Sequence, residues 1–203
     1  MLESILRQHI PYKRQLSRKS LIFFAFLTYV ALLMVVLYIV VSLSVLVSIS
    51  GSSMEGTYSD GDIVLINRYL NNPKVNDIAV IELDEETIIK RVVAVGGQVV
   101  QFRSSGNEVL FFKGESVESL EVVKEDYVNQ SMSLSFFVRY KIPLNKAIVI
   151  PHGEVFVMGD NRNDSLDSRM LGSFSTSKVK GIVYLKLDKG GLLEYIFKFV
   201  YNI

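Results

Sequence analysis

A serine-rich segment, Gly51-Ser-Ser-Met-Glu-Gly-Thr-Tyr-Ser-Asp-Gly-Asp62, holds the first residues of this chain that could do chemistry. A Gly-Ser-Ser sequence that opens a turn can expose a hydroxyl and aim backbone N–H groups at one point. Acyl transfer needs that geometry, because fixed donors must meet the oxyanion of the tetrahedral intermediate. Taken alone, the segment favours a plainer interpretation, since serine-rich turns beside an apolar stretch are usually solvated linkers.

A lysine in an apolar strand is the second candidate. Lys90 lies within Ile88-Ile-Lys-Arg-Val-Val93, and the alternation of side chains along a strand predicts that Lys90 and Arg91 point in opposite directions. If Lys90 faces the interior, burial lowers its pKa, and a neutral amine can take a proton from a serine hydroxyl. The alternative is that Arg91 is buried in an ion pair and Lys90 is solvated. The strand alone does not decide between them.

The third cluster is Phe156-Val-Met-Gly-Asp-Asn-Arg-Asn-Asp-Ser-Leu-Asp-Ser-Arg-Met-Leu-Gly172, where an apolar strand runs into a turn dense in charged and amide side chains. Such a mixture predicts a rigid polar network. Its many oxygen donors also suggest a calcium loop. The EF-hand pattern, however, lacks its glycine and its final glutamate, and two arginines interrupt the acidic residues. The sequence therefore favours the network and predicts no metal site.

These clusters follow a long apolar segment that predicts a membrane anchor. No charged residue occurs between Lys19 and Glu55, and the run over residues 21–49 exceeds the roughly 20 residues that cross a bilayer. Residues 1–20 hold five basic residues and one acidic residue, which gives 5 − 1 = +4. The positive-inside rule places this basic tail in the cytoplasm and residues 50–203 outside. A cleaved export signal is the alternative, because Ser48-Ile-Ser50 resembles a cleavage site, but its apolar part would be shorter.

Short strand patterns dominate the rest of the chain and predict a mainly β fold. Residues 113–146 show no clear period, and residues 100–150 are interpreted as a variable, insertion-like region of the domain. Residues 192–203 are too short to cross a bilayer and predict a final core helix or an interfacial one, with the core helix favoured. The predicted strands are 62–66, 77–83, 87–95, 98–102, 108–112, 147–150, 154–158 and 180–187.

Composition excludes some chemistry and some partners. The chain has no cysteine, so neither a disulfide framework nor a thiolate nucleophile is possible. Its net charge of +1 argues against a nucleic-acid partner held by a broad basic face. A Ser-His-Asp hydrolase stays open only through His152, because His9 lies in the predicted cytoplasmic tail. No nucleophile elbow supports that alternative.

In this order and behind an apolar segment, the three clusters resemble the bacterial type I signal peptidases, and within them the Gram-positive branch. Ser53-Met54 with Thr57 is similar to the nucleophile motif of that family. Lys90-Arg91-Val92-Val93 is similar to its general-base motif, and Gly159–Arg169 is similar to its long motif near the carboxyl end. This last match is the most specific of the three.

The resemblance implies a membrane-anchored serine endopeptidase with a domain of coiled antiparallel β-sheets and no cofactor. It implies that Ser53 is the nucleophile, that Lys90 is the general base, and that Ser165 hydrogen-bonds the lysine and orients it. The Ser53 backbone N–H is implied as one oxyanion donor, and Gly51 stands where some relatives place a hydroxyl as the second. The other implied support residues are Ser52, Asp160, Arg162, Asp167 and Arg169, and the implied walls of a pocket for small side chains are Ile49, Met54 and Ile89.

The implied substrates are exported preproteins, cut after a small residue at the outer face of the cell membrane, with the lipid bilayer as a second partner. Gly56 and Gly97 depart from the family, whose members usually have proline there, and glycine loosens a turn that proline would stiffen. Some relatives have lost catalytic residues and serve in surface-fibre assembly. The alternative here is a dedicated or chaperone role in the assembly of exported surface proteins such as pili, but the presence of both Ser53 and Lys90 favours the peptidase.

Overall fold

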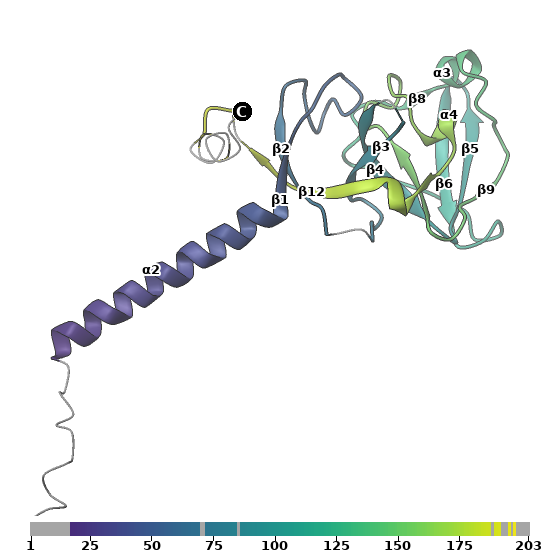
Figure 1. The fold of residues 1–203 in the computed structure, drawn as a ribbon. Helices are drawn as coiled ribbons and strands as arrows, with labels where there is room; N and C mark the ends of the chain where they lie inside the picture. Colours follow the sequence, from purple (N-terminus) through teal and green to yellow (C-terminus); the bar gives the residue numbers. More distant parts are fainter. Residues whose placement is uncertain are drawn as a thin grey trace, which may run out of the picture. The chain divides into compact units, whose positions relative to one another are not determined.

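The chain divides into two compact units, residues 1–42 and residues 43–203. In the computed structural model, the described residues are 17–69, 72–84, 86–187, 189–191, 195 and 197. Among the described residues, the first unit is helical and the second is built mainly from β-strands (Figure 1). The mainly β fold predicted from the sequence is confirmed.

One long apolar helix, α2, spans Arg18–Leu43. Its segment Arg18–Val40 has a mean hydropathy of 2.6 with none of it buried, and among the described residues it is the one helix long and apolar enough to cross a membrane. The predicted anchor ran on to residue 49, but the helix ends at Leu43 and Ser44–Ser48 forms strand β1. Pairing with a neighbouring strand along all five residues of β1 stabilises it over a further helical turn.

A seven-stranded sheet makes up most of the second unit. Its order is β1-β2-β12-β3-β4-β10-β11, and all neighbours are antiparallel. Register shifts interrupt the pairing of β10 with β4 and both pairings of β12, and such bulges bend and twist a sheet. The sheet is therefore coiled, as predicted. Besides β1, its strands are β2 Ile63–Asn67, β3 Ile78–Glu82, β4 Thr87–Val95, β10 Glu154–Met158, β11 Phe174–Ser175 and β12 Val179–Leu187.

A second sheet has the order β7-β6-β5-β9, with β8 also pairing with β6. Its centre is a hairpin in which β5 and β6, both at predicted strands, pair over seven residues each. Residues 113–146, which show no period in the sequence, contain β7, β8 and the short helix α3. The bounds are β5 Val99–Ser105, β6 Glu108–Gly114, β7 Glu121–Val122, β8 Met132–Ser133, α3 Leu134–Arg139 and β9 Ile148–Val149.

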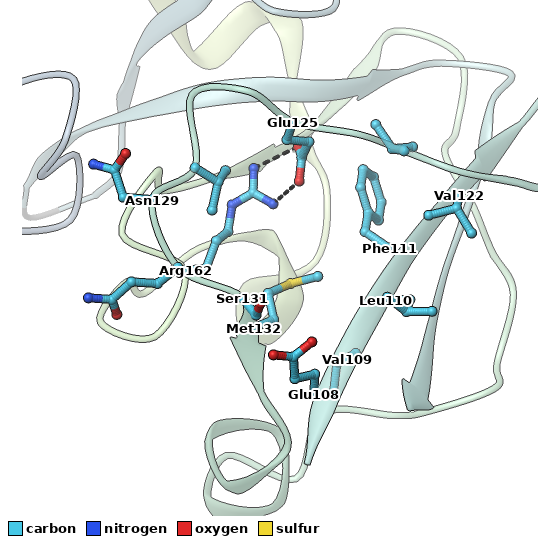
Figure 2. Close-up of a pocket in the computed structure, with 13 residues that line it drawn as sticks. Glu108, Val109, Leu110, Phe111, Val122, Glu125, Asn129, Ser131, Met132 and Arg162 are labelled. Atoms are coloured by element: carbon cyan, nitrogen blue, oxygen red, sulfur yellow. Dashed lines mark hydrogen bonds and ion pairs between the residues drawn. The ribbon is translucent and has the colours of Figure 1, made fainter. Parts of the chain in front are cut away.

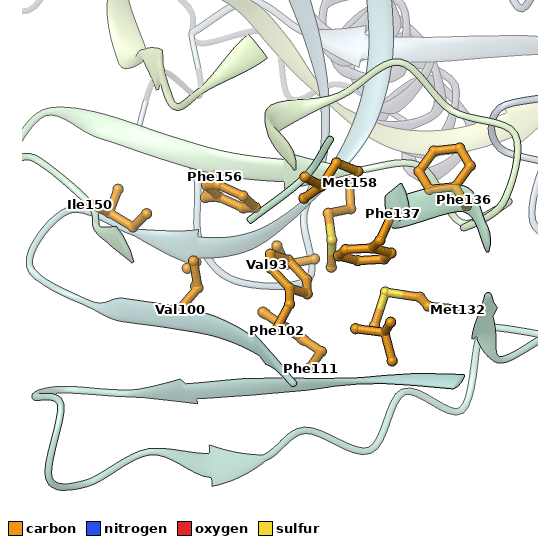
Figure 3. Close-up of a cluster of buried hydrophobic side chains, with 13 residues drawn as sticks. Val93, Val100, Phe102, Phe111, Met132, Phe136, Phe137, Ile150, Phe156 and Met158 are labelled. Atoms are coloured by element: carbon orange, nitrogen blue, oxygen red, sulfur yellow. The ribbon is translucent and has the colours of Figure 1, made fainter. Parts of the chain in front are cut away.

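The largest hydrophobic cluster lies between the two sheets. Figure 3 shows Phe156 and Met158 of β10 and Val93 of β4 on one side, facing Phe102 of β5 and Phe111 of β6 on the other. Helix α3 contributes Phe136 and Phe137 to the same cluster. The region that looked insertion-like therefore supplies part of the core.

Two short helical segments complete the described fold, the helix α4 over Ser168–Leu171 and a 3₁₀ turn over Thr176–Lys178. The final helix predicted over residues 192–203 lies outside the described residues, except for Tyr195 and Phe197.

Candidate active site

Lys90 and Ser53 meet in the second unit. The Lys90 amine donates a hydrogen bond to Ser53 Oγ at 2.7 Å and another to the carbonyl of Ile89 at 3.0 Å. Lys90 is only 4% exposed and Arg91 only 8%. Each interpretation of this strand is therefore right in part: Arg91 is buried in an ion pair with Asp160, but Lys90 is buried and not solvated, on the opposite face of β4.

Burial changes the proton affinity of Lys90. Desolvation lowers the pKa of the Lys90 amine below its usual value, because the ammonium form loses hydration that apolar surroundings do not replace. The negative charges of Asp167 and Glu86 act in the opposite direction and favour the charged form. The net effect is a lowered pKa, so a larger fraction of the Lys90 amine is neutral at a given pH and able to accept a proton.

The segment Ile49–Asp62, here called the Ser53 loop, is closed at its base like a hairpin. Ile49 N–H donates to the carbonyl of Asp62, and Gly61 N–H donates to the carbonyl of Ile49, each at 2.8 Å. Ile49 and Met54 are buried in a cluster with β2, β3 and β4. The loop is thus fixed by two apolar anchors on either side of Ser53, which explains why so serine-rich a segment is not a loose linker.

Two backbone N–H groups of this loop, those of Gly51 and Ser53, are candidates for binding the oxyanion. Gly51 N–H donates to the Asp60 carboxylate at 2.8 Å, so that donor is already used within the loop. Among the described residues, Ser53 N–H has no hydrogen-bond partner. The implied first oxyanion donor is therefore available, whereas the Gly51 amide is not available as it stands.

The turn after β10 holds the Ser53 loop from its other side. Asn161 donates its backbone N–H to the Ser53 carbonyl and its side-chain amide to the Ser52 carbonyl, both at 3.1 Å. Ser52 Oγ in turn donates to the Asp164 carboxylate at 2.6 Å. Ser52 and Asn161 therefore both join the loop to this turn, and Asn161 is not among the support residues that the resemblance implies.

An arginine–carboxylate pair links three elements behind Ser53. Arg91 of β4 donates two hydrogen bonds to the Asp160 carboxylate, at 2.8 and 2.6 Å. Thr57 Oγ1 of the Ser53 loop donates to the same carboxylate at 2.6 Å. Because a bidentate arginine pair fixes both partners in one geometry, this contact sets the distance between β4 and the loop.

A second buried pair shapes the turn that carries Asp160. The Asp167 carboxylate accepts two hydrogen bonds from the Arg169 guanidinium, each at 2.8 Å, and one from Gly159 N–H at 3.0 Å. Arg162 donates to the Gly159 carbonyl at 3.0 Å and forms a bidentate ion pair with Glu125 (Figure 2). The carboxylates of Asp160 and Asp167, which suggested a calcium loop, are thus committed to arginines.

Ser165 lies in the same turn as Asp167 but does not make the implied hydrogen bond to Lys90. Its hydroxyl is buried and has no hydrogen-bond partner among the described residues, while the Lys90 amine donates to Ser53 and Ile89 instead. The packing around it is tight, because a Cβ atom at Gly159 would lie 2.3 Å from Ser165 Oγ and 2.4 Å from the Ser53 carbonyl oxygen. The implied hydrogen bond from Ser165 to Lys90 is therefore absent.

A pocket of about 460 Å³ opens in front of Ser53 and Lys90. The implied pocket walls Ile49, Met54 and Ile89 do not line it, since all three are buried in the cluster beneath the loop. Alternation along β4 explains the error, because Ile88 and Lys90 face the pocket while Ile89 faces away. The residues that do line it are Ser50, Gly51, Ser52, Ser53, Glu86, Ile88, Lys90, Phe136, Tyr140, Asp164, Ser165, Leu166 and Met170.

Gly56 and Gly97, which stand where family members usually have proline, both adopt backbone conformations that proline cannot adopt. Gly56 has φ of +101° and Gly97 has φ of +93°, whereas a proline ring fixes φ near −65°. His152, the histidine of the alternative hydrolase, is exposed and packs beside Gly97. It therefore belongs to a surface turn and gives that alternative no support.

Comparison with known proteins decides the family. The sequence pattern of the family described as "Signal peptidase, peptidase S26" matches residues 21–187. The chain belongs to this family. Signal peptidase I of Bacillus licheniformis is 31% identical over 140 residues, covering 66% of this chain and 70% of the relative. Signal peptidase I of Bacillus amyloliquefaciens is 30% identical over 138 residues with the same coverage, and signal peptidase I T of Bacillus subtilis (strain 168) is 29% identical over 139 residues, covering 66% and 68%.

The family assignment made from the three motifs is confirmed, and this signal peptidase is a serine endopeptidase of the signal peptidase I type. The comparisons favour that activity over a chaperone role in surface-protein assembly. The motifs led to Ser53, Lys90 and the arginines Arg162 and Arg169 because each of these residues lies within a short sequence motif of its own. Phe136, Tyr140 and Met170 of the pocket were missed, because each sits on a helix of six residues or fewer, or at its end.

Proposed function

We propose that this signal peptidase cuts exported preproteins after a small residue, with Ser53 as nucleophile and Lys90 as general base. The single observation that carries the proposal is the 2.7 Å hydrogen bond from the buried Lys90 amine to Ser53 Oγ. A base must be within hydrogen-bond reach of the proton that it takes, and burial lowers the Lys90 pKa. Both conditions for a neutral amine acting on a serine are therefore supported.

The reaction would proceed by acyl transfer. Lys90 takes the Ser53 proton as Oγ attacks the carbonyl carbon of the scissile bond, and the Ser53 N–H stabilises the oxyanion. The Lys90 ammonium then gives its proton to the leaving amine, which is the amino terminus of the mature protein. Water, deprotonated by Lys90, hydrolyses the ester and releases the signal peptide from Ser53. No cofactor takes part in these steps.

We also propose a membrane-anchored topology. Helix α2 is apolar and long enough to cross a bilayer, and the basic residues that precede it favour a cytoplasmic location for residues 1–20. Residues 50–203 would then lie outside, where a translocated signal peptide ends. The preprotein and the lipid bilayer are the partners in this proposal, and no nucleic acid is involved.

Cleavage of a preprotein in detergent micelles tests the proposal. The wild type is expected to cut on the carboxyl side of a small residue, and amino-terminal sequencing of the product locates the cut. Ser53→Ala and Lys90→Ala are each expected to lower kcat by more than about 10³-fold. Matched controls are Ser59→Ala, from the same loop, and Lys113→Ala, whose amine also has its pKa lowered by burial. Undiminished cleavage by either Ser53→Ala or Lys90→Ala would falsify the assigned pair.

A further inference from the structure

The loop between β7 and β8, residues 123–131, contacts residues that support the proposed active site but does not line the pocket of that site. Figure 2 shows one of its residues, Glu125, facing the Arg162 guanidinium beside β6. The Arg162 side chain is only 1% exposed and that of Glu125 only 9%. None of the loop residues is among those that line the pocket of Ser53 and Lys90. Any effect of this loop on the pocket of Ser53 and Lys90 therefore passes through other residues.

Tyr127 covers the arginine that pairs with Asp160. The Arg91 guanidinium carbon lies 3.9 Å from the centre of the Tyr127 ring, and that of Arg162 lies 5.9 Å from it. The Tyr127 hydroxyl donates to Glu125 at 2.6 Å. Burial raises the pKa of Tyr127 well above its usual value, and the hydrogen bond to Glu125 adds to this, so the hydroxyl remains a donor. One aromatic ring thus contacts both buried arginines and is held in place by the carboxylate that pairs with Arg162.

The same loop also reaches the Ser53 loop directly. A Cβ atom at Gly56 would lie 2.6 Å from the Asn129 side-chain nitrogen, so the two loops are in close contact there. Gly56 is one of the positions where relatives usually carry proline, and its φ of +101° excludes that residue. The Asn129 side chain therefore occupies the space next to Gly56, where a larger residue than glycine would clash with it.

From Tyr127 the path to Ser53 is short. Arg91 fixes Asp160 by two hydrogen bonds, and Asp160 accepts from Thr57 of the Ser53 loop. The next residue, Asn161, donates its N–H to the Ser53 carbonyl. Water that reached the Arg91 guanidinium would compete for these charged contacts. An aromatic face over the guanidinium excludes water and adds a cation–π attraction.

We propose that Tyr127 is a positioning residue of this peptidase: its ring shields the Arg91–Asp160 pair and so keeps Ser53 Oγ in line with the Lys90 amine. This inference rests on the proposed roles of Ser53 and Lys90. Small misplacements of reacting groups are costly, since an error of about 1 Å can slow a reaction on the order of 10²-fold. The ring, and not the hydroxyl, is the part that shields Arg91.

The test compares Tyr127→Leu and Tyr127→Phe in the full-length protein, in detergent, with a preprotein substrate. Tyr127→Leu removes the aromatic face and is expected to lower kcat by about tenfold while KM stays within about twofold. Tyr127→Phe keeps the face and is expected to retain kcat within about twofold. The matched control is Phe112→Leu, which removes a similar contact, at 4.2 Å to Arg103 in the second sheet, and which should lower the melting temperature without lowering kcat.

Asn129→Ala is a second variant, which removes the contact with Gly56 of the Ser53 loop. Asn129 is exposed, so this variant should fold, and it is expected to lower kcat severalfold at constant KM. If Tyr127→Leu does not fold, this variant decides alone. Wild-type kcat in folded Tyr127→Leu, or in Asn129→Ala where Tyr127→Leu does not fold, would overturn the inference, and so would an equal loss of kcat in Phe112→Leu. Ser53→Ala in the same assay separates the two proposals. If Ser53→Ala is inactive and Tyr127→Leu is fully active, only the positioning role fails; if Ser53→Ala cleaves, the proposed function itself fails.

Discussion

A lysine amine accepts a proton only in its neutral form, and at Lys90 two opposing influences set how much of that form is present. Burial favours the neutral amine, whereas the carboxylates of Asp167 and Glu86 favour the ammonium. Asp167 already accepts hydrogen bonds from Arg169 and Gly159. Glu86, in contrast, is exposed and lines the pocket. Glu86 is therefore the charge through which the Lys90 pKa is most easily adjusted.

Glu86→Gln is expected to move the pH dependence of cleavage toward lower pH. The negative charge of Glu86 raises the Lys90 pKa, so removing that charge lowers it further. Activity that requires the neutral amine rises with pH through this pKa, and the rising limb of kcat/KM should begin at lower pH in the variant. The measurement is the pH profile of kcat/KM, with Glu108→Gln, an exposed carboxylate on β6, as the control. A limb that stays in place or moves to higher pH would contradict the role of Lys90 as base.

Among the elements, the Ser53 loop depends on contacts at its base as much as on its own sequence. The Asp62 carboxylate accepts from Ser59 N–H at 2.8 Å and pairs with Lys186 at 2.5 Å and Lys189 at 3.3 Å. The hydrogen bond from Lys186 is the main cause that lowers the pKa of Asp62 to about 2, and the Ser59 N–H adds to it. The ionised form of Asp62 therefore stabilises the folded state.

Asp62→Asn is expected to reduce the free energy of unfolding by roughly 1 kcal/mol at neutral pH. Because the folded-state pKa lies below the unfolded value of about 3.9, this stabilisation is fully present above that value. It is lost as the pH falls through the folded pKa of about 2. Denaturant unfolding at pH 7 and pH 2.5 measures the difference, with Asp84→Asn of the exposed Lys178 pair as control. A difference that persists unchanged at the lower pH would contradict the ionic explanation.

Sequence patterns predicted most of the strands but not the contacts that join distant elements. Period-two alternation and bounding turns identified β2 to β6 and β9, β10 and β12, because these signals are local. The order of the strands in each sheet comes from pairings such as β12 between β2 and β3, which no local pattern contains. Helix α3 was missed because six residues are too few to display a helical period.

The same limit explains which parts of the site could be predicted. Alternation showed that Lys90 and Arg91 face opposite sides, but not that both are buried, since the partner of Arg91 is Asp160, 69 residues further along. The resemblance to a family supplied the residue pairing that local physics left open. It failed for Ile49, Met54 and Ile89, because whether a buried side chain borders a pocket depends on the packing of several loops at once.

At the scale of the whole molecule, the two units meet different physical requirements. The 26 residues of α2 extend about 39 Å at roughly 1.5 Å per residue, longer than the hydrocarbon core of about 30 Å. The second unit has buried hydrophobic clusters of its own. Its internal contacts show that it begins at Leu43. Strand β1 follows the helix at once, so the chain passes from the proposed anchor into the sheet that carries Lys90 without a linker.

Two truncated chains test where the second unit begins. A chain over residues 44–203 keeps β1, whereas a chain over residues 50–203 loses β1 and Ile49. Val45, Val47 and Ile49 pack in the cluster that anchors Met54, so the shorter chain should be less stable by about 4 kcal/mol. Both chains lack α2, which makes the longer one the control for the shorter. Equal melting temperatures would show that β1 is not part of the folded unit.

An acyl group on Ser53 would show directly that Ser53 is the nucleophile. A single turnover of a preprotein in detergent would be quenched with acid, and the digested enzyme would be examined by mass spectrometry. We expect the fragment with Ser53 to gain the mass of the bound signal peptide in the wild type, and this adduct to be absent in Lys90→Ala. Cleaved product with Ser53 unmodified, or an adduct on a different residue, would contradict this expectation.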